Sequence, residues 1–332
     1  MKSTYSPIRE CQIFSGRANP ELAQAVAEEC EIGLSPIQLE DFADGEIKCR
    51  LDASVRGNYV FAIQSHGGGE MDVNKAVAEH ELIIDAARGG SADRVIAVCP
   101  YLGYGRQDRK SAGRESIAAG LTIDRLTRAG ANPIVGFDLH APQIQGFTRL
   151  PFDNLTAAAL LRNTITPELE KGVVIVASDA GGVKAAIEQR KRIDPKLEPQ
   201  IAYINKVRDP NSVNEVEVLE LVGDVKGRQT VIVEDMIDTA GTLKEASDLL
   251  SERGAADQLV IATHAVLSGK APETLARSAL RKVVVTNTRA LTEEQKIDKI
   301  QVASVARIIA QAIEQIFTDG SISKLFEGEN LK

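Results

Sequence analysis

The sequence predicts an α/β protein with two domains, each built as a mostly parallel β-sheet flanked by helices. Short runs rich in Val and Ile alternate along the whole chain with longer segments of helical periodicity. Acidic or glycine-containing turns directly follow several of these runs, as is typical of the carboxyl ends of parallel strands. The chain has 332 residues, which is enough for two domains of roughly 100 to 200 residues each.

Composition narrows the class of protein. The net charge is −8 and Trp is absent, which argues against nucleic acid as the main partner. No apolar run approaches the roughly 18 residues of a membrane span, and residues 1–10 lack the apolar segment of a signal peptide. The four cysteines are scattered without a Cys-x-x-Cys pair, so their spacing indicates neither a zinc site nor a disulfide framework. We expect a soluble cytoplasmic protein that binds neither nucleic acid nor a membrane.

The first half of the chain contains four expected strands and three expected helices. The strands are 13–16, 59–64, 94–98 and 133–137, and the helices are 20–30, 73–88 and 117–129. Residues 38–51 are predicted to form a β-hairpin, because Asp44-Gly45 is a strong turn signal between alternating stretches. The segment 149–154 is the expected boundary, which gives an N-terminal domain of residues 1–154 and a C-terminal domain of residues 155–332.

The second half repeats the alternation of strands and helices and predicts a second doubly wound sheet. The expected strands are 173–177, 201–204, 230–233, 258–262 and 283–286, and the expected helices are 183–189, 243–253 and 300–316. The last of these, from Ile300 to Ile316, is amphipathic. This C-terminal helix is a candidate to pack back on the first domain.

Residues 231–242 place an apolar strand, two acids, a small-residue turn and a helix start in immediate succession. Glu234 and Asp235 end the strand, where neighbouring carboxylates accept hydrogen bonds from vicinal sugar hydroxyls. The backbone N–H groups of the following turn converge on a phosphate at a helix N-terminus. That turn consists of Asp238, Thr239, Ala240, Gly241 and Thr242. The plain alternative is a strand-to-helix turn capped by Asp238 or Thr239.

Several other segments carry candidate binding residues. His140 ends a buried strand beside an acid, a position suited to a ligand or a metal, and Asp179 is a candidate magnesium ligand because hard cations take oxygen donors. The basic loop that follows residues 94–98 opens with Gly103-x-Gly105 but is not a P-loop. Each segment by itself also fits a structural interpretation: a hairpin tip, a solvated basic loop or a capping histidine.

Taken together, these segments resemble the ribose-phosphate diphosphokinase (phosphoribosyl diphosphate synthetase) family, class I-like. The acids and the turn Asp-Thr-Ala-Gly-Thr are similar to the family's phosphoribosyl diphosphate motif, although Glu234 stands where the family usually has Asp. The run Asp-Leu-His-Ala-Pro-Gln-Ile-Gln-Gly-Phe from Asp138 to Phe147 is the least ambiguous likeness, because ordinary phosphoribosyltransferases lack it. The resemblance covers about Ile13 to Phe326 and implies two phosphoribosyltransferase-type (type I) domains.

The resemblance implies a role for each segment. Residues 234, 235 and 238–242 bind ribose 5-phosphate. The hairpin tip reaches into the ATP site of a neighbouring subunit, and the Arg-Gln-Asp loop binds ATP. The implied ATP-binding residues are Phe42, Asp44, Glu46, Arg106, Gln107 and Asp108. The implied catalytic residues are Lys206, Arg208 and His140, and the implied Mg²⁺ residues are His140 and Asp179. Ser54, Arg56, Ser321 and Ser323 match an allosteric phosphate site, whereas Ala112-Gly113-Arg114 departs from the regulated members.

The implied activity transfers the β,γ-diphosphoryl group of ATP to the 1-hydroxyl of ribose 5-phosphate, for nucleotide biosynthesis, in a homo-oligomer that is a hexamer or another dimer-based assembly. Two alternatives stay open. An ordinary phosphoribosyltransferase leaves the Arg-Gln-Asp and Asp-Leu-His segments unexplained. A regulatory subunit without turnover is disfavoured by the presence of Lys206, Arg208 and His140. We assign no role to the other three histidines, which are His66, His80 and His264.

Overall fold

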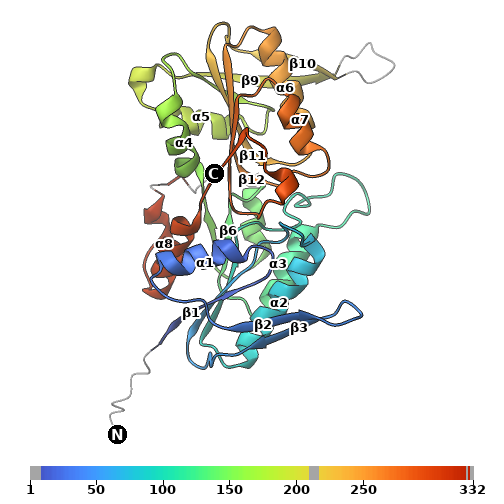
Figure 1. Ribbon diagram of the computed structural model, residues 1–332, viewed down its shortest axis with the longest axis vertical. Coiled ribbons are helices and arrows are strands. Elements are labelled where there is room, and N and C mark those ends of the chain that lie inside the picture. Colours follow the sequence, from blue (N-terminus) through green and yellow to red (C-terminus); the bar gives the residue numbers. More distant parts are fainter. Residues whose placement is uncertain (1–8, 209–216, 327, 330–332) are drawn as a thin grey trace. The chain divides into compact units, whose positions relative to one another are not determined.

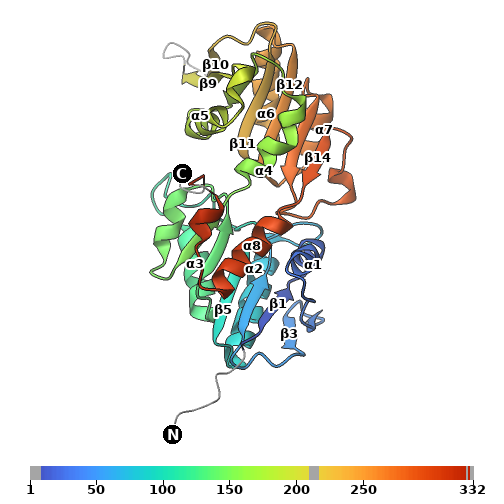
Figure 2. The ribbon, with the colours of Figure 1, turned by 90° about the vertical axis from the view of Figure 1, so that its left-hand side faces the viewer.

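A computed structural model describes residues 9–208, 217–326 and 328–329. The chain forms two compact units (Figures 1 and 2). Unit 1 contains the described residues up to Thr156, together with Thr288–Ala290 and those from Ser304 to Glu329. Unit 2 contains the described residues of Ala157–Asn287 and Leu291–Ala303.

Unit 1 is built on a five-stranded parallel sheet of order β1-β4-β5-β6-β7. The strands are β1 (Cys11–Ser15), β4 (Tyr59–Ile63), β5 (Arg94–Cys99), β6 (Ile134–Phe137) and β7 (Phe152–Leu155). A separate hairpin pairs β2 (Ile37–Asp41) with β3 (Ile47–Leu51). The helices are α1 (Pro20–Glu29), α2 (Val73–Gly89), α3 (Ala118–Ala129) and α8 (Ala306–Phe317).

Both faces of the unit 1 sheet are covered, which explains its near-continuous apolar strands. Phe14, Val60 and Ala97 share a buried cluster with Ile83 of α2 and Ile123 of α3. The opposite face carries α1 and α8 (Figures 1 and 2). There the Tyr59 ring meets the Phe317 ring edge to face at 5.7 Å.

Unit 2 holds a seven-stranded sheet of order β10-β9-β8-β11-β12-β13-β14, parallel except for the β9–β10 pair. The strands are β8 (Val174–Ala177), β9 (Gln200–Arg208), β10 (Glu217–Val222), β11 (Gln229–Ile237), β12 (Asp257–Ala265), β13 (Lys282–Thr286) and β14 (Ile300–Ala303). The helices are α4 (Ala158–Ile165), α5 (Val183–Lys191), α6 (Gly241–Glu252) and α7 (Ala271–Arg277). Side chains of α6 and α7, including Leu250 and Leu275, complete the core with Ile232 and Val260.

Short 3₁₀ turns complete the described chain at Pro142–Phe147, Thr166–Glu168, Pro195–Leu197, Glu293–Gln295 and Ile322–Leu325. None of the described helices is long and apolar enough to cross a membrane. The predicted α/β class with two helix-flanked, mostly parallel sheets is confirmed. The helices expected at 20–30, 73–88 and 117–129 and the hairpin around Asp44-Gly45 are also confirmed.

Two expectations from the sequence are corrected. The helix expected at Ile300–Ile316 is two elements, β14 followed by α8, because Ile300–Ala303 pairs in register with β13. The strand expected at 230–233 continues to Ile237, because β12 also continues and supplies hydrogen-bond partners as far as Ala265. The chain passes from unit 1 to unit 2 after Thr156, shortly beyond the segment 149–154 that was expected as the boundary.

Candidate functional site

The acid pair and the small-residue turn lie together at the carboxyl end of β11 in unit 2. Glu234 and Asp235 are half-buried near the end of the strand, and Thr239 is exposed just before α6. Ala240 adopts the left-handed conformation, with φ of 60°, and α6 begins at Gly241. The first amides of any helix have no partner within that helix, and their partial positive charge favours an anion. A turn of this geometry can accept an anion such as a phosphate.

A hydrogen bond from the Ser178 hydroxyl to the Glu234 carboxylate joins β11 to its neighbour β8. Burial is the main reason that the pKa of Glu234 is raised to about 7. The hydrogen bond from Ser178 lowers this pKa, and the nearby charges of Asp235 and Asp179 raise it. Asp235 Oδ1 accepts a hydrogen bond of 2.7 Å from the Met236 amide. The strand end thus concentrates negative charge where a cation or a polyol binds well.

Asp179 belongs to the turn between β8 and α5, beside this acid pair. It is exposed, and its Oδ1 accepts a 2.8 Å hydrogen bond from the Gly182 amide, which fixes the carboxylate at the turn. The negative charge of Asp179 helps to raise the pKa of Glu234. The structure therefore brings together three carboxylates at the ends of two neighbouring strands. Such a group of oxygen donors fits a hard divalent cation, which takes carboxylates and retains water.

In unit 1, the loop after β5 and the segment that carries His140 are tied together. Asp108 is buried, and its Oδ2 accepts a 2.5 Å hydrogen bond from Gln143 Nε2, three residues beyond the exposed His140. Arg106 and Gln107 are exposed on the same loop. Two segments that the sequence singled out separately thus form one surface. Arg106, Gln107 and His140 are presented to solvent, whereas Asp108 holds the loop in place.

The hairpin tip at Phe42 is well formed and solvent-facing. The amides of Phe42 and Gly45 donate to Glu46 O and Phe42 O at 2.8 and 2.9 Å, and Gly45 has φ of 93°, which favours glycine. Asp44 Oδ1 accepts from the Glu46 amide at 3.1 Å, so this carboxylate helps to shape the turn. The Phe42 side chain is 53% exposed, so its ring is accessible at the hairpin tip.

The remaining sequence candidates are placed as follows. Lys206 and Arg208 belong to β9, opposite Leu219 and Glu217 of β10; their side chains lie outside the described part of the structure. Ser54 and Arg56 are exposed in the loop before β4. Ser321 is half-buried and Ser323 exposed at the last 3₁₀ turn.

The structure also shows polar groups that the sequence did not single out. Ser178 is the hydroxyl partner of Glu234, and Ser at a strand end carries no particular signal. His66, His80 and Cys99 meet in the interior of unit 1, although 33 residues separate the first from the last. The pairing of β4 with β5 and the packing of α2 against these strands bring them together, and neither can be read from the residues themselves.

Comparisons with known proteins agree along almost the whole chain. Residues 11–130 match the family model described as the N-terminal domain of ribose phosphate pyrophosphokinase, and residues 167–327 match the phosphoribosyl synthetase-associated domain. The chain is 43% identical to a ribose-phosphate pyrophosphokinase of Streptomyces coelicolor, over 96% of this chain and 97% of that protein. It is 44% identical to the protein of that name from Caldanaerobacter subterraneus, over 95% of this chain and 97% of that protein.

A solved structure is similar as well. The phosphoribosylpyrophosphate synthetase from Mycobacterium smegmatis superposes with a TM-score of 0.87 and 40% sequence identity. The match covers 94% of this chain and 100% of that one. The likeness therefore extends through both units rather than through one shared domain.

Proposed function

This chain belongs to the ribose-phosphate pyrophosphokinase family, and we propose how its own residues carry out the family's reaction. The enzyme transfers the β,γ-diphosphoryl group of ATP to the 1-hydroxyl of ribose 5-phosphate and releases 5-phosphoribosyl 1-diphosphate and AMP. The observation that carries the proposal is the strand end of β11, where an acid pair adjoins an anion-binding helix start.

Ribose 5-phosphate is held by two parts of this strand end. Its 5-phosphate accepts hydrogen bonds from the turn at residues 238–242, where the helix dipole of α6 adds a favourable field. Its 2- and 3-hydroxyls donate to Glu234 and Asp235. Because the carboxylate of Glu234 is positioned by Ser178, the sugar is oriented as well as bound, and its 1-hydroxyl is presented in a fixed direction.

ATP is held by the surface of unit 1 that carries Arg106, Gln107 and His140, with the Arg106 loop fixed through Asp108. Diphosphoryl transfer depends on alignment and charge neutralisation more than on covalent catalysis. We assign the neutralisation of the β-phosphoryl oxygens to Lys206 and Arg208. Phe42 of a neighbouring subunit stacks on adenine, with Asp44 and Glu46 beside it.

The chemistry of the donor set fits Mg²⁺. Asp179 Oδ1 accepts the Gly182 amide and the other carboxylate oxygen is offered to the ion. The negative charges of Asp235 and Asp179 beside Glu234 support a cation at this strand end. His140 is exposed on the nucleotide surface as a further ligand. When bound, Mg²⁺ draws electron density from the phosphate oxygens and neutralises their charge.

The enzyme is proposed to be a cytoplasmic homo-oligomer, a hexamer or another dimer-based assembly. Cys11, Cys30 and Cys49 are free and half-buried, as is usual in a reducing compartment. The exposed Phe42 at the hairpin tip supports a site that a second subunit completes. Ser54, Arg56, Ser321 and Ser323 are proposed to bind a regulatory phosphate.

Phosphorus NMR of the purified protein with magnesium, ATP and ribose 5-phosphate tests the reaction. Equal amounts of AMP and 5-phosphoribosyl 1-diphosphate are expected. ADP with a simple sugar phosphate would identify an ordinary kinase and contradict the assignment. A folded protein that binds both ligands without forming product would instead indicate a regulatory subunit.

Replacement of Lys206 tests the catalytic assignment. Lys206→Ala is expected to lower turnover about 10² to 10³-fold, as loss of one transition-state donor does, and to leave the KM for ribose 5-phosphate within a few-fold. Lys226→Ala, which removes an exposed lysine elsewhere in unit 2, is the control for charge and should keep full turnover. Unchanged turnover in Lys206→Ala would remove this residue from the mechanism.

A further inference from the structure

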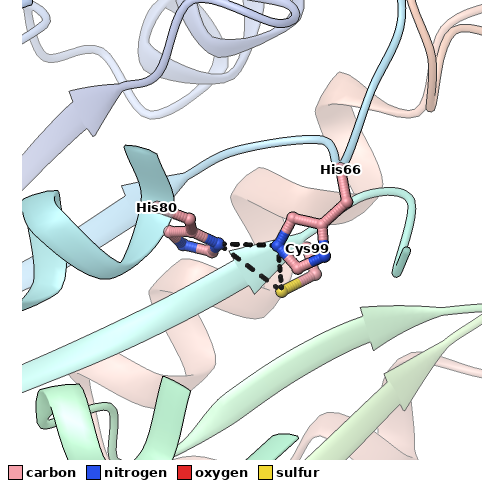
Figure 3. Close-up of side chains that lie close together, drawn as sticks. All are labelled: His66, His80 and Cys99. Atoms are coloured by element: carbon pink, nitrogen blue, oxygen red, sulfur yellow. Dashed lines mark hydrogen bonds between the residues drawn. The ribbon is translucent and has the colours of Figure 1, made fainter. Parts of the chain in front are cut away.

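Three metal-binding side chains meet in the interior of unit 1, apart from the residues assigned to catalysis. His66 follows β4, His80 lies in α2, and Cys99 is the last residue of β5. All three are fully buried, with relative exposure of 0%. Figure 3 shows the two imidazole rings and the thiol directed toward one another from these three elements.

The distances within the cluster suit a metal ion. His66 Nε2 and His80 Nδ1 are 3.0 Å apart, and Cys99 Sγ lies 3.9 Å from each of them. An ion about 2.05 Å from both nitrogens would lie about 2.2 Å from the sulfur if it sat in the plane of the three atoms. The sulfur distance is that of an ordinary metal–thiolate bond. The two nitrogens must move apart from 3.0 Å toward the roughly 3.5 Å of a three-coordinate site, a shift of about 0.5 Å that rotation of the imidazole rings can supply.

The number and charge of the donors discriminate between metals. A structural Zn²⁺ site takes four ligands, whereas this cluster offers three ligand atoms among the described residues. Two neutral imidazoles and one thiolate cancel a single positive charge, so a divalent ion would leave a net charge in a buried site. Thiolate and imidazole together favour a soft ion. We propose that His66, His80 and Cys99 bind one monovalent copper ion, Cu⁺.

The hydrogen bonds of His66 and His80 show which ring nitrogens carry a hydrogen before Cu⁺ binds. Ala62 O accepts from His80 Nε2 at 3.0 Å, so this nitrogen carries the hydrogen and Nδ1 has a lone pair. The Gly103 amide donates to His66 Nδ1 at 3.1 Å, so His66 carries its hydrogen on Nε2 and donates it to His80 Nδ1. Without the ion, the two rings are therefore joined by one hydrogen bond.

Binding of Cu⁺ balances with the release of one proton and no change of oxidation state. The Cys99 thiol loses its proton and forms the copper–sulfur bond. The Nε2 hydrogen of His66 is replaced by the ion, and the neutral ring then carries its hydrogen on Nδ1. His80 keeps its hydrogen on Nε2 and its bond to Ala62 O, and binds the ion through Nδ1.

The tautomer change at His66 couples the ion to the loop after β5. A hydrogen on His66 Nδ1 faces the Gly103 N–H, so the 3.1 Å hydrogen bond is lost. Gly103 lies tightly against this ring, since a Cβ there would be 2.9 Å from the His66 Cβ. This loop carries Arg106 and Gln107, so, resting on their proposed role in ATP binding, Cu⁺ and ATP oppose each other by thermodynamic linkage.

Competition with a colorimetric Cu⁺ chelator under anaerobic conditions tests the site. The native chain, and the chain refolded from urea so that entry to the interior is not limiting, are each expected to withdraw one Cu⁺ per chain. Cys99→Ser and His80→Gln should lose this uptake, and circular dichroism verifies that each variant is folded. Cys30→Ser removes a half-buried thiol beside Glu29 and Glu314 and should keep full uptake.

X-ray absorption of the copper-loaded protein supplies the second measurement. One sulfur and two imidazole nitrogens around copper are expected. Uptake that survives in Cys99→Ser, a sulfur-only environment from the other cysteines, or preferential uptake of Zn²⁺ would each overturn the proposal. No uptake by the refolded native chain would do the same and would leave the cluster as a hydrogen-bonded structural element.

The linkage is measured separately, so that the metal site and the nucleotide role can fail independently. Addition of magnesium and ATP is expected to weaken Cu⁺ uptake by the native chain several-fold, and Cu⁺ is expected to raise the Kd for ATP by the same factor. Equal Cu⁺ affinity with and without ATP, in a protein that binds ATP, would overturn the coupling. Failure to bind ATP at all would instead contradict the proposed function.

Discussion

Glu234 shows how a single carboxyl group is changed by its place at a buried strand end. Its pKa is raised to about 7, chiefly because burial disfavours the charged form. In the unfolded chain the group titrates near 4.5. Between these two pH values the folded protein holds a proton that the unfolded chain has released. The free energy of unfolding that Glu234 contributes is therefore fully present below pH 4.5 and is lost as pH rises through 7.

Glu234→Gln tests this assignment, because the amide keeps the size of the side chain and removes the titration. Without ligands, the stability of the variant relative to the native protein is expected to increase from pH 5 to pH 8, as measured by urea unfolding. Glu245→Gln on α6 removes an exposed carboxylate and should leave the pH dependence unchanged. Parallel pH profiles for the native protein and Glu234→Gln would contradict the raised pKa.

Single residues were predictable from the sequence where they lie in a contiguous motif. Glu234, Asp235 and the turn up to Thr242 follow one another in the chain, and their place at a strand end is a local property. The contact of Ser178 with Glu234 depends instead on which strands are neighbours, and the contact of His66 with His80 depends on how α2 packs against the sheet. Residues that come together from different elements have no fixed separation in the sequence, so the sequence alone does not identify them as partners.

The turn between β1 and α1 depends on one buried carboxylate of α2. Glu79 is fully buried, and its Oε1 accepts hydrogen bonds from the Arg17 amide at 2.7 Å and from Gln64 Nε2 at 2.9 Å. Its Oε2 accepts from Arg17 Nε at 2.5 Å. The other end of the Arg17 guanidinium meets Asp41 at 2.8 Å, at the exposed end of β2 just before the hairpin tip. One arginine thus makes a buried and an exposed ion pair.

The two pairs are expected to differ in their effect on stability. Glu79→Ala leaves Gln64 and the Arg17 amide without their acceptor in the interior and is expected to cost about 3 to 5 kcal/mol. Asp41→Ala removes the exposed pairs of this carboxylate with Arg17 and Lys75, and its effect on the urea midpoint should be small because solvent screens such pairs. Equal shifts of the two midpoints would show that Glu79 does not hold the turn.

Elements were predictable where their periodicity is long and clear, as in α2 and α3. The error at 300–316 has a physical cause. A short apolar run such as Ile300–Ala303 satisfies both helical and strand patterns, and only pairing with β13 decides between them. The length of β11 was underestimated for the same reason, because the strand continues as far as its neighbour β12 supplies partners.

For the molecule as a whole, the chain does not divide into two contiguous halves. After leaving unit 1 at Thr156, it returns for Thr288–Ala290 and again from Ser304, so that α8 completes the first unit. The sequence made the C-terminal helix a candidate to pack back on the first domain, and α8 belongs to unit 1. The alternation of strands and helices gives no sign of the earlier return at Thr288–Ala290. Ile309, Ile313 and Ile316 of α8 are at most 9% exposed.

The return of α8 predicts how fragments behave. Burial of an isoleucine side chain contributes about 1.5 to 3 kcal/mol, so loss of the three from α8 is comparable to the 5 to 15 kcal/mol that stabilises a typical domain. Residues 1–156 alone are expected to be unfolded or aggregated. The same fragment joined to residues 304–329 through a flexible Gly/Ser linker of about 15 residues should fold, with a cooperative urea transition and native-like circular dichroism. A control fusion with Ile309→Asp and Ile313→Asp should behave like the shorter fragment. If residues 1–156 unfold cooperatively without α8, this helix is dispensable, and the first unit is a contiguous domain.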